Sequence, residues 1–414
     1  MTFSLYERWA FTHDRTLVPY FRGIEQNAPY YGTPCTTTSC GWSDVPMWDS
    51  IAASRDYAVT GDSLALSKAK AAFHFIDGAT TFNSSGACRS INYQRPGGST
   101  GLKTLETDAN YVKAALLLYG ETHDASYLSK AQAKYAAIRT YFLDSHLPLY
   151  SVYVFDQGGA CTQIPRRFFA SVNGDMITSG LLLYAATNNG TYAADAIVTG
   201  EAVAANLSDP NGVFADLQAD NDIVEPLVEA MHDLFANGQV FAGQWLLKNA
   251  SAGAGAMETT GSYGRFFDGP VPNGGITAFS GNGGFALAIA AADVGGAQTI
   301  TPQSDWSSAV YTSKALGVNS SVTFTGTAIA LIGTLGDKCC SQGHARVFVD
   351  GLETTNEVGI WQNKSSASIR IANSILFAWR WPNSGTHTVS FAPGIYDPKE
   401  GGSYLNLAGY FVKP

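Results

Sequence analysis

A six-residue pattern recurs three times in the first half of the chain and constrains its fold more than any other feature. The copies are Tyr57-Ala-Val-Thr-Gly-Asp62, Tyr119-Gly-Glu-Thr-His-Asp124 and Tyr184-Ala-Ala-Thr-Asn-Asn189. Each copy lies between two stretches whose apolar residues are three or four positions apart, the spacing of one helix face. The Tyr closes the first helix, the Thr begins the turn, and the Asp or Asn caps the second helix. The pattern therefore predicts helical hairpins, which stack into a toroid or solenoid when repeated at this period.

Three weaker helical units complete the count. They lie at Ile223–Leu247, in the Gly-rich stretch Gly281–Ala292, and within Leu5–Phe21 near the N-terminus. A period of about 60 residues gives roughly five units before residue 300, and the N-terminal unit makes a sixth. We therefore predict an all-α (α/α)6 toroid over residues 1–298.

The composition changes near residue 300, around Asp293–Pro302. Short β-branched and aromatic runs follow, separated by Gly, Asn, Pro and Ser, and Asp350-Gly351 is a hairpin-turn signal. The predicted strands are Ser321–Thr325, Ala328–Ile332, Ala345–Val349, Ser368–Ile371, Ile375–Trp379, His387–Phe391 and Leu405–Val412. Short strands at this spacing predict an all-β jelly-roll sandwich over residues 303–414. The fold class is thus multidomain, a helical toroid followed by a sandwich.

The charge pattern excludes two classes of partner. Charged residues make up 14% of the chain, the net charge is -9, and no block of five or six basic residues occurs. Nucleic acids and anionic membranes are held through clustered Lys and Arg, so we expect neither as a partner. No apolar run reaches the length of a membrane span. We expect a monomer that acts on a polysaccharide or oligosaccharide.

Cysteines and glycosylation sequons favour a secreted protein. The six cysteines are even in number, and six Asn-x-Ser/Thr sequons occur, at Asn83, Asn189, Asn206, Asn249, Asn319 and Asn363. Together they indicate a compartment that permits disulfides, with a signal peptide absent from this sequence. Cys35 and Cys40 are close enough for a local staple, and Cys88 and Cys161 flank the second hairpin and are candidates to tie its loops together. Cys339-Cys340 is either a vicinal pair or two half-cystines with other partners.

No metal or organic cofactor is predicted. No Cys-x2-Cys pair occurs and the seven His are scattered, which argues against structural zinc. The Gly-rich stretches lack the Lys and the strand-then-helix context of a phosphate-binding loop.

Two segments next to the repeats suggest a family. Trp48-Asp49-Ser50 leads into the first copy, and Ser171-Val-Asn-Gly174 leads into the third. Over roughly residues 45–290 the chain resembles the six-hairpin glycosidases, in particular the endo-α-1,6-mannanases of glycoside hydrolase family 76. The resemblance implies hydrolysis of a polysaccharide, possibly α-1,6-mannan, in the central cleft of the toroid. The tail after residue 303 resembles the jelly-roll modules of secreted carbohydrate enzymes.

One departure from that family concerns the catalytic carboxylates. The family has two adjacent aspartates about a dozen residues before the second Tyr, where this chain reads Leu105-Glu-Thr-Asp-Ala-Asn-Tyr111. Glycoside hydrolysis needs two carboxyl groups that flank the bond. Glu106 and Asp108 are therefore the predicted catalytic pair, at a helix start where Thr107 is the expected N-cap. The alternative is that both only favour the first helical turn, where acids are common.

Other polar residues have two interpretations each. Trp48 with Asp49 is a pairing that clefts use to hold sugars, or an ordinary core Trp. Asp175 is either a helix cap or a sugar ligand. The acidic cluster of Asp220, Asp222, Glu225 and Glu229 is either a loop with a solvated helix face or the source of a second catalytic carboxylate. His232 and Arg265 are either structural or lyase-type residues. The predicted substrate-binding residues are Trp48, Asp49, Tyr111, Asn173, Asp175 and Asp222.

Two rival functions remain open from the sequence. A polysaccharide lyase on the same toroid would need Tyr, His and Arg near the cleft to neutralise a uronate and remove its proton. A non-catalytic glycan-binding or cell-wall protein is permitted by the broken Asp-Asp pair.

Overall fold

The computed structural model describes residues 2–27, 41–78, 82, 86–98, 101–157, 159–215, 223–257, 261, 263–271, 278–296, 303–336, 342–361, 370–394 and 407–414. The α-helices within these ranges are α1 (Thr2–Thr12), α2 (Val18–Asn27), α3 (Val45–Thr60), α4 (Ser63–Gly78), α5 (Leu105–Thr122), α6 (Ala125–Tyr141), α7 (Ala170–Thr187), α8 (Gly190–Asn206), α9 (Glu225–Ala236), α10 (Val240–Ala256) and α11 (Ala278–Gly295). The strands are β1 (Leu102–Thr104), β2 (Tyr153–Gln157), β3 (Ala160–Gln163), β4 (Val310–Leu316), β5 (Ser321–Gly336), β6 (Gln342–Val349), β7 (Leu352–Glu353), β8 (Val358–Trp361), β9 (Arg370–Pro393) and β10 (Leu407–Lys413). Short 3-10 helices occur at Arg15–Leu17 and Pro96–Gly98.

The chain forms two compact units, and each is described separately. The first unit comprises residues 1–164, 171–200 and 229–239. It contains the helices from α1 to α6, nearly all of α7, most of α8 and α9, and the strands β1 to β3. The second unit comprises residues 165–170, 201–228 and 240–414, with α10, α11 and β4 to β10. The predicted division near residue 300 stays a prediction.

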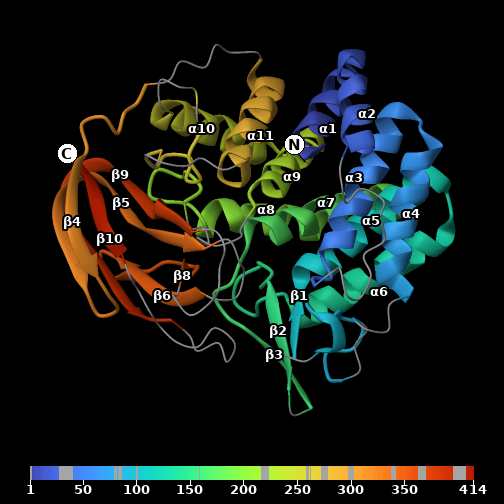
Figure 1. Ribbon diagram of the computed structural model, residues 1–414, viewed down its shortest axis with the longest axis horizontal. Helices are drawn as coiled ribbons and strands as arrows, with labels where there is room; N and C mark the ends of the chain where they lie inside the picture. The colour runs from blue at the N-terminus through green and yellow to red at the C-terminus, as the bar shows by residue number, and fades with distance from the viewer. Residues whose placement is uncertain are drawn as a thin grey trace. The chain divides into compact units, whose positions relative to one another are not determined.

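The three repeat copies form equivalent hairpin turns in the first unit. In the second copy, His123 at φ 56° donates its N–H to the carbonyl of Tyr119, 2.8 Å away. The Thr122 hydroxyl donates to the Leu118 carbonyl (2.6 Å) and accepts the N–H of Asp124 (3.2 Å). The Asp124 carboxylate then accepts the Ser126 N–H (2.9 Å), which caps α6. The same four bonds join α3 to α4 and α7 to α8, which confirms the predicted hairpins (Figure 1).

A fourth copy follows α1, where the Tyr is replaced by Trp9. His13 at φ 51° donates to the Trp9 carbonyl, Thr12 donates to the Arg8 carbonyl, and Asp14 accepts the Thr16 N–H. The predicted N-terminal unit is therefore present, and its turn uses the same chemistry. A closed ring of six hairpins stays a prediction.

The first unit is not purely helical, which corrects the predicted all-α toroid. The strands β1, β2 and β3 form a small antiparallel sheet, and β2 and β3 are a hairpin. Leu105 at the start of α5 donates its N–H to the carbonyl of Val152, the residue before β2, so this bond ties the start of α5 to the edge of the sheet. The predicted pairing of Cys88 with Cys161 is present and ties the segment before β1 to β3. The other four cysteines lie outside the described residues.

The described strands of the second unit form one seven-stranded antiparallel sheet in the order β4-β10-β5-β9-β6-β7, with β8 also paired to β6. The three strands predicted between residues 368 and 391 are one strand, β9, and the two predicted within 321–332 are one strand, β5. Register shifts along the β5–β9 pair let these long strands continue. For example, Gly326 of β5 pairs with Gly385 of β9, whereas Ala328, two residues later, pairs with Arg380. Two hydrogen-bonded sheets are therefore not seen among these strands, and the predicted jelly roll is not confirmed.

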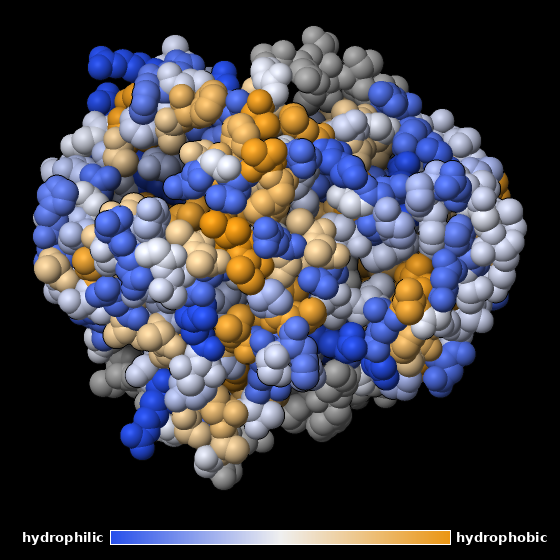
Figure 2. Space-filling model, turned by 180° about the vertical axis from the view of Figure 1, so that it is seen from behind, coloured by the Kyte–Doolittle hydropathy of each residue, from blue (hydrophilic) through white to orange (hydrophobic). Residues whose placement is uncertain are grey.

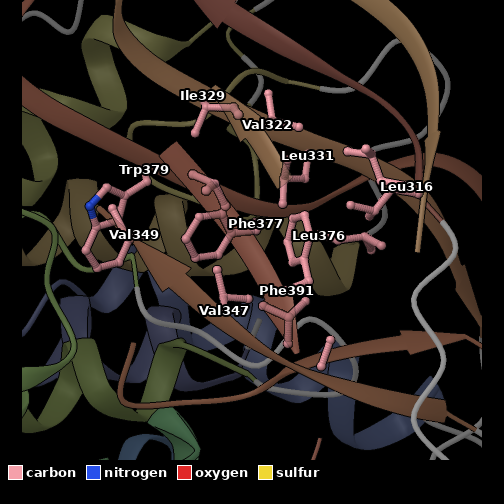
Figure 3. Close-up of a cluster of buried hydrophobic side chains, with 14 of the residues drawn as sticks. Leu316, Val322, Ile329, Leu331, Val347, Val349, Leu376, Phe377, Trp379 and Phe391 are labelled. Atoms are coloured by element: carbon pink, nitrogen blue, oxygen red, sulfur yellow. The ribbon is translucent and has the colours of Figure 1, made fainter. Parts of the chain in front are cut away.

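Side chains of β5, β6 and β9 form the core beside this sheet. Leu331, Val347 and Phe377 are almost fully buried and point toward one another (Figure 3). The predicted turn at Asp350-Gly351 is confirmed, because both residues have positive φ between β6 and β7.

The surface carries apolar residues among polar ones. Tyr20, Val240 and Leu352 are more than half exposed, and the face drawn in Figure 2 likewise mixes hydrophobic with hydrophilic residues. No helix within the described ranges is long and apolar enough to cross a bilayer.

Candidate functional site

The N-terminal ends of α3 and α5 meet in the first unit. The hydroxyls of Ser43 and Thr107 are hydrogen-bonded at 2.5 Å, and both residues are fully buried. Asp44 follows Ser43 and Glu106 precedes Thr107, so each of the two joined helix ends carries an acidic residue next in sequence to this contact. We refer to Trp42, Asp44, Trp48, Arg95 and Glu106 as the α3/α5 site.

Glu106 is half-buried in the first turn of α5. The N-cap of this helix is Thr104 rather than the predicted Thr107, since the Thr104 hydroxyl accepts the Glu106 N–H at 3.2 Å. The same hydroxyl lies 3.2 Å from Glu106 Oε2 and donates to it. Thr107 cannot be the cap, because it lies inside α5 and its hydroxyl is hydrogen-bonded to the Ser43 hydroxyl. The carboxylate of Glu106 is favoured here by the positive end of the helix dipole.

Aromatic side chains accompany these carboxyl groups. The Arg95 guanidinium lies 4.0 Å from the centre of the Trp42 ring, which holds that ring in place. Trp48 is half-buried in the first turn of α3. Burial raises the pKa of Asp44, against hydrogen bonds from the backbone and from the Trp48 side chain. The Asp44 carboxyl group, to which the Trp48 side chain is hydrogen-bonded, therefore keeps its proton to higher pH than usual.

Asp49 lies next to Trp48 on α3 and is half-buried. Burial raises the pKa of its carboxyl group to about 6. No other residue in the described part of the chain contributes to that shift.

Asp108 is buried completely and faces away from Glu106, toward α6 and the segment before β1. Its carboxylate accepts the backbone N–H of Asn92 at 2.9 Å and the side-chain amide of Asn92 at 2.8 Å. Lys134 of α6 forms an ion pair with it at 2.7 Å. Positions i and i+2 of a helix point to opposite sides, so Glu106 and Asp108 have different surroundings.

A buried charge network lies deeper in the first unit. Lys113 of α5 contacts Asp175 of α7 and Glu229 of α9, both at 2.9 Å, and Arg55 of α3 also pairs with Glu229. Although burial acts to raise it, the charges of Arg55 and Lys113 lower the pKa of Glu229. Burial raises the pKa of Asp175, against the charge of Lys113. Glu7 of α1 lies 4.0 Å from Arg55, so five helices contribute to this network.

The network corrects two interpretations of the sequence. Glu229 is not on a solvated helix face, because it is 4% exposed and doubly paired. Asp175 is not a helix cap, since it lies in the second turn of α7 and its partner is Lys113. The remaining members of the acidic cluster differ: Glu225 is buried at the start of α9, while Asp220 and Asp222 lie outside the described residues.

The other predicted residues have structural partners. Tyr111 donates to Asp77 of α4 at 2.6 Å and is 5% exposed. Asn173 is fully buried and exchanges two hydrogen bonds with the backbone of Tyr150. His232 lies 3.4 Å from Glu7. Arg265 belongs to the second unit and is half-buried.

Sequence reasoning missed Asp44, Trp42 and Arg95. Asp44 had a recognisable signal, since an Asp before Val-Pro is typical of a helix start. No sequence pattern marks Arg95, because its contact with Trp42 joins two segments that are distant in the chain. Within the described residues, no three His, Cys, Asp or Glu side chains gather as a metal site requires.

Comparison with known proteins identifies the fold. No protein-family model and no curated protein sequence matches the chain. Solved structures do match, among them an α-1,6-mannanase of family GH76 from Salegentibacter sp. HEL1_6, with a TM-score of 0.62, 19% identity, and coverage of 71% of this chain and 88% of that one. The chain has a fold like that of glycoside hydrolase family 76.

Further neighbours agree with this fold. A GH76 α-mannanase of Bacteroides thetaiotaomicron matches with a TM-score of 0.58, 17% identity, and coverage of 72% of this chain and 84% of that one. Dfg5 from Chaetomium thermophilum, solved with glucosamine, matches with a TM-score of 0.54, 11% identity, and coverage of 73% and 81%. The Salegentibacter enzyme was also solved with an α-1,6-mannotetraose as an inactive variant that lacks two consecutive aspartates. The present sequence contains no two consecutive aspartates.

Proposed function

We propose that this protein is a secreted glycoside hydrolase that cleaves a polysaccharide, with α-1,6-mannan as the leading substrate. The observation that carries the proposal is the pair of carboxyl groups, Asp44 and Glu106, at the joined ends of α3 and α5 within this fold. The Trp48 indole beside the Asp44 carboxyl group suits a sugar, because an aromatic face stacks on the apolar face of a pyranose while an acid accepts hydrogen bonds from its hydroxyls.

The two carboxyl groups suit different roles. Hydrolysis needs one protonated acid and one carboxylate. The raised pKa of Asp44 suits the acid that protonates the leaving oxygen. Glu106, near the positive end of α5, suits the carboxylate that attacks or activates water. The α-1,6-mannanases of similar fold support the substrate class, and the disulfide and the exposed sequons at Asn189 and Asn319 support secretion.

Asp108 was the other predicted catalytic residue, and its contacts favour a positioning role. Two hydrogen bonds from Asn92 and an ion pair with Lys134 occupy its carboxylate. In this proposal Asp108 anchors the start of α5, and thereby Glu106, to α6. That position for Asp108 also supports a second candidate, a glycan-binding protein without catalysis, because the two acids of the sequence motif do not converge.

An assay that incubates the protein with α-1,6-mannan and measures the release of reducing ends tests the proposal. Glu106→Gln and Asp44→Asn should each lower turnover by about 10²–10⁴-fold with little change in melting temperature. Glu121→Gln, at the opposite end of α5, is the matched control and should keep full turnover. Asp108→Asn should lower stability more than it lowers the turnover of the folded protein.

Three results would redirect the proposal. Full turnover in both the Glu106 and Asp44 variants would place the catalytic groups elsewhere. Binding of mannan without any new reducing ends would favour the non-catalytic candidate. Products that absorb as 4,5-unsaturated uronates would identify a lyase.

A further inference from the structure

A cavity of about 220 Å³ lies in the first unit between α4, α5 and α6, on the side of α5 opposite Glu106. Ile76, Tyr111 and Ala133 provide its apolar wall. Asp77, Asn92, Lys130 and Lys134 provide its polar groups. Its volume is below the roughly 300–1,000 Å³ of pockets for drug-sized ligands and suits a single small molecule.

Two ion pairs balance the charge of this cavity. Lys130 pairs with Asp77 at 2.6 Å, and Lys134 pairs with the buried Asp108 at 2.7 Å. Although partial burial acts to raise it, hydrogen bonds from Lys130 and Tyr111 lower the pKa of Asp77, so this acid is ionised at neutral pH. Two positive charges therefore face two negative ones, and the cavity favours neither an anion nor a cation.

Polar groups that can form further hydrogen bonds line this cavity. An ammonium group has three N–H donors. Lys130 uses one on Asp77, and Lys134 uses two, on Asp108 and on the Ser90 carbonyl. The Asn92 amide gives Asp108 one of its two N–H donors, and each Asp77 oxygen accepts one hydrogen bond of the two it can take. Hydroxyl groups donate and accept at once, so this mixture suits a polyol.

We propose that this cavity, lined by Asp77, Asn92, Tyr111, Lys130, Ala133 and Lys134, is a second sugar-binding site that takes one neutral hexopyranose unit. The apolar face of the sugar contacts Ile76 and Ala133, and its hydroxyls bind the Lys and Asp side chains. The site is separate from the α3/α5 site and does not depend on the proposed hydrolysis. Its use would be to hold a glycan chain against α4 and α6.

Filling the cavity tests the site without breaking an ion pair. Ala133 is exposed on α6, so Ala133→Trp should fold and occupy the space with an indole ring. Ala136→Trp adds the same ring to an exposed position of α6 that does not line the cavity, and is the matched control. Trp48→Ala reports on binding at the α3/α5 site.

Saturation-transfer NMR of the full chain with methyl α-D-mannopyranoside, methyl α-D-glucopyranoside and methyl α-D-galactopyranoside measures the binding. We expect at least one of these probes to bind, with affinity at least tenfold weaker in Ala133→Trp and unchanged in Ala136→Trp. Glucuronate and glucosamine, which carry a charge, should bind more weakly than the neutral probe.

The inference is overturned if no neutral probe binds at high millimolar concentration, or if Ala133→Trp binds as the wild type does. It is also overturned if only Trp48→Ala removes the binding, which would place the sugar at the α3/α5 site alone. Loss of hydrolysis in Glu106→Gln bears only on the proposed enzyme, so the two proposals fail independently.

Discussion

Replacing Asp233 by Asn should make the protein more stable at neutral pH. Asp233 lies one turn after Glu229 on α9 and accepts a hydrogen bond from the Thr178 hydroxyl at 2.8 Å. Burial raises the pKa of Asp233 to about 7, and the like charges of Glu7 and Glu229 add to this. The Thr178 hydrogen bond and the charge of Lys113 act in the opposite direction.

The sign and size of the effect follow from that shift. The folded protein holds the proton of Asp233 up to a pH near 7, whereas the unfolded chain loses it near 3.8. The stabilisation is therefore complete below about pH 4 and is lost as the pH rises through 7. The difference between a pKa near 7 and one near 3.8 corresponds to about 4 kcal/mol at most, and because the Asp233 side chain is partly exposed, solvent screening reduces this to about 2 kcal/mol.

Urea unfolding of the wild type and of Asp233→Asn at pH 4, 5, 6, 7 and 8 measures the difference. The amide still accepts the Thr178 hydrogen bond but carries no charge, so the variant should gain about 2 kcal/mol relative to wild type between pH 4 and pH 8. Asp124→Asn is the control, because hydrogen bonds from Ser126 lower the pKa of Asp124 and its contribution is instead lost as the pH falls. A difference between wild type and Asp233→Asn that does not change with pH would refute the reasoning.

Three further predictions concern stability. Lys113→Met should lower the free energy of unfolding by about 3–5 kcal/mol, because it removes a cation that pairs with Asp175 and Glu229. Adding Asp175→Asn should restore part of the loss. An unchanged midpoint of urea unfolding in Lys113→Met would contradict this. Asn189→Ala should cost about 0.5–2 kcal/mol through loss of the α8 cap, while Asn189→Asp should be close to neutral in the same assay. Replacing both Cys88 and Cys161 by Ser should lower the free energy of unfolding by about 2–5 kcal/mol, which a lower melting temperature would show. A reducing agent should lower the melting temperature of the wild type more than that of this double variant.

The hairpins were predictable because their signal is local. Thr122, His123 and Asp124 make their bonds within a few residues along the chain, and the same bonds occur wherever the pattern recurs. The copy at Trp9 was harder to recognise because the Tyr is replaced, although Thr12 and Asp14 keep their roles. The helical positions of Glu106 and Asp108 were predictable for the same reason.

The surroundings of these acids depended on contacts between distant segments. Asp108 is occupied because Asn92 and Lys134 approach it from a loop and from α6, and no sequence spacing encodes those approaches. Glu229 carries the pattern of a surface acid, but Arg55 and Lys113 lie far from it in sequence and make it a buried ion. Likewise, turn-like residues near Gly385 predicted separate strands, whereas pairing with β5 carries β9 through them as one strand. Neighbouring residues in the sequence determine local hydrogen bonds, whereas burial and charge pairing depend on which distant residues the folded chain brings together.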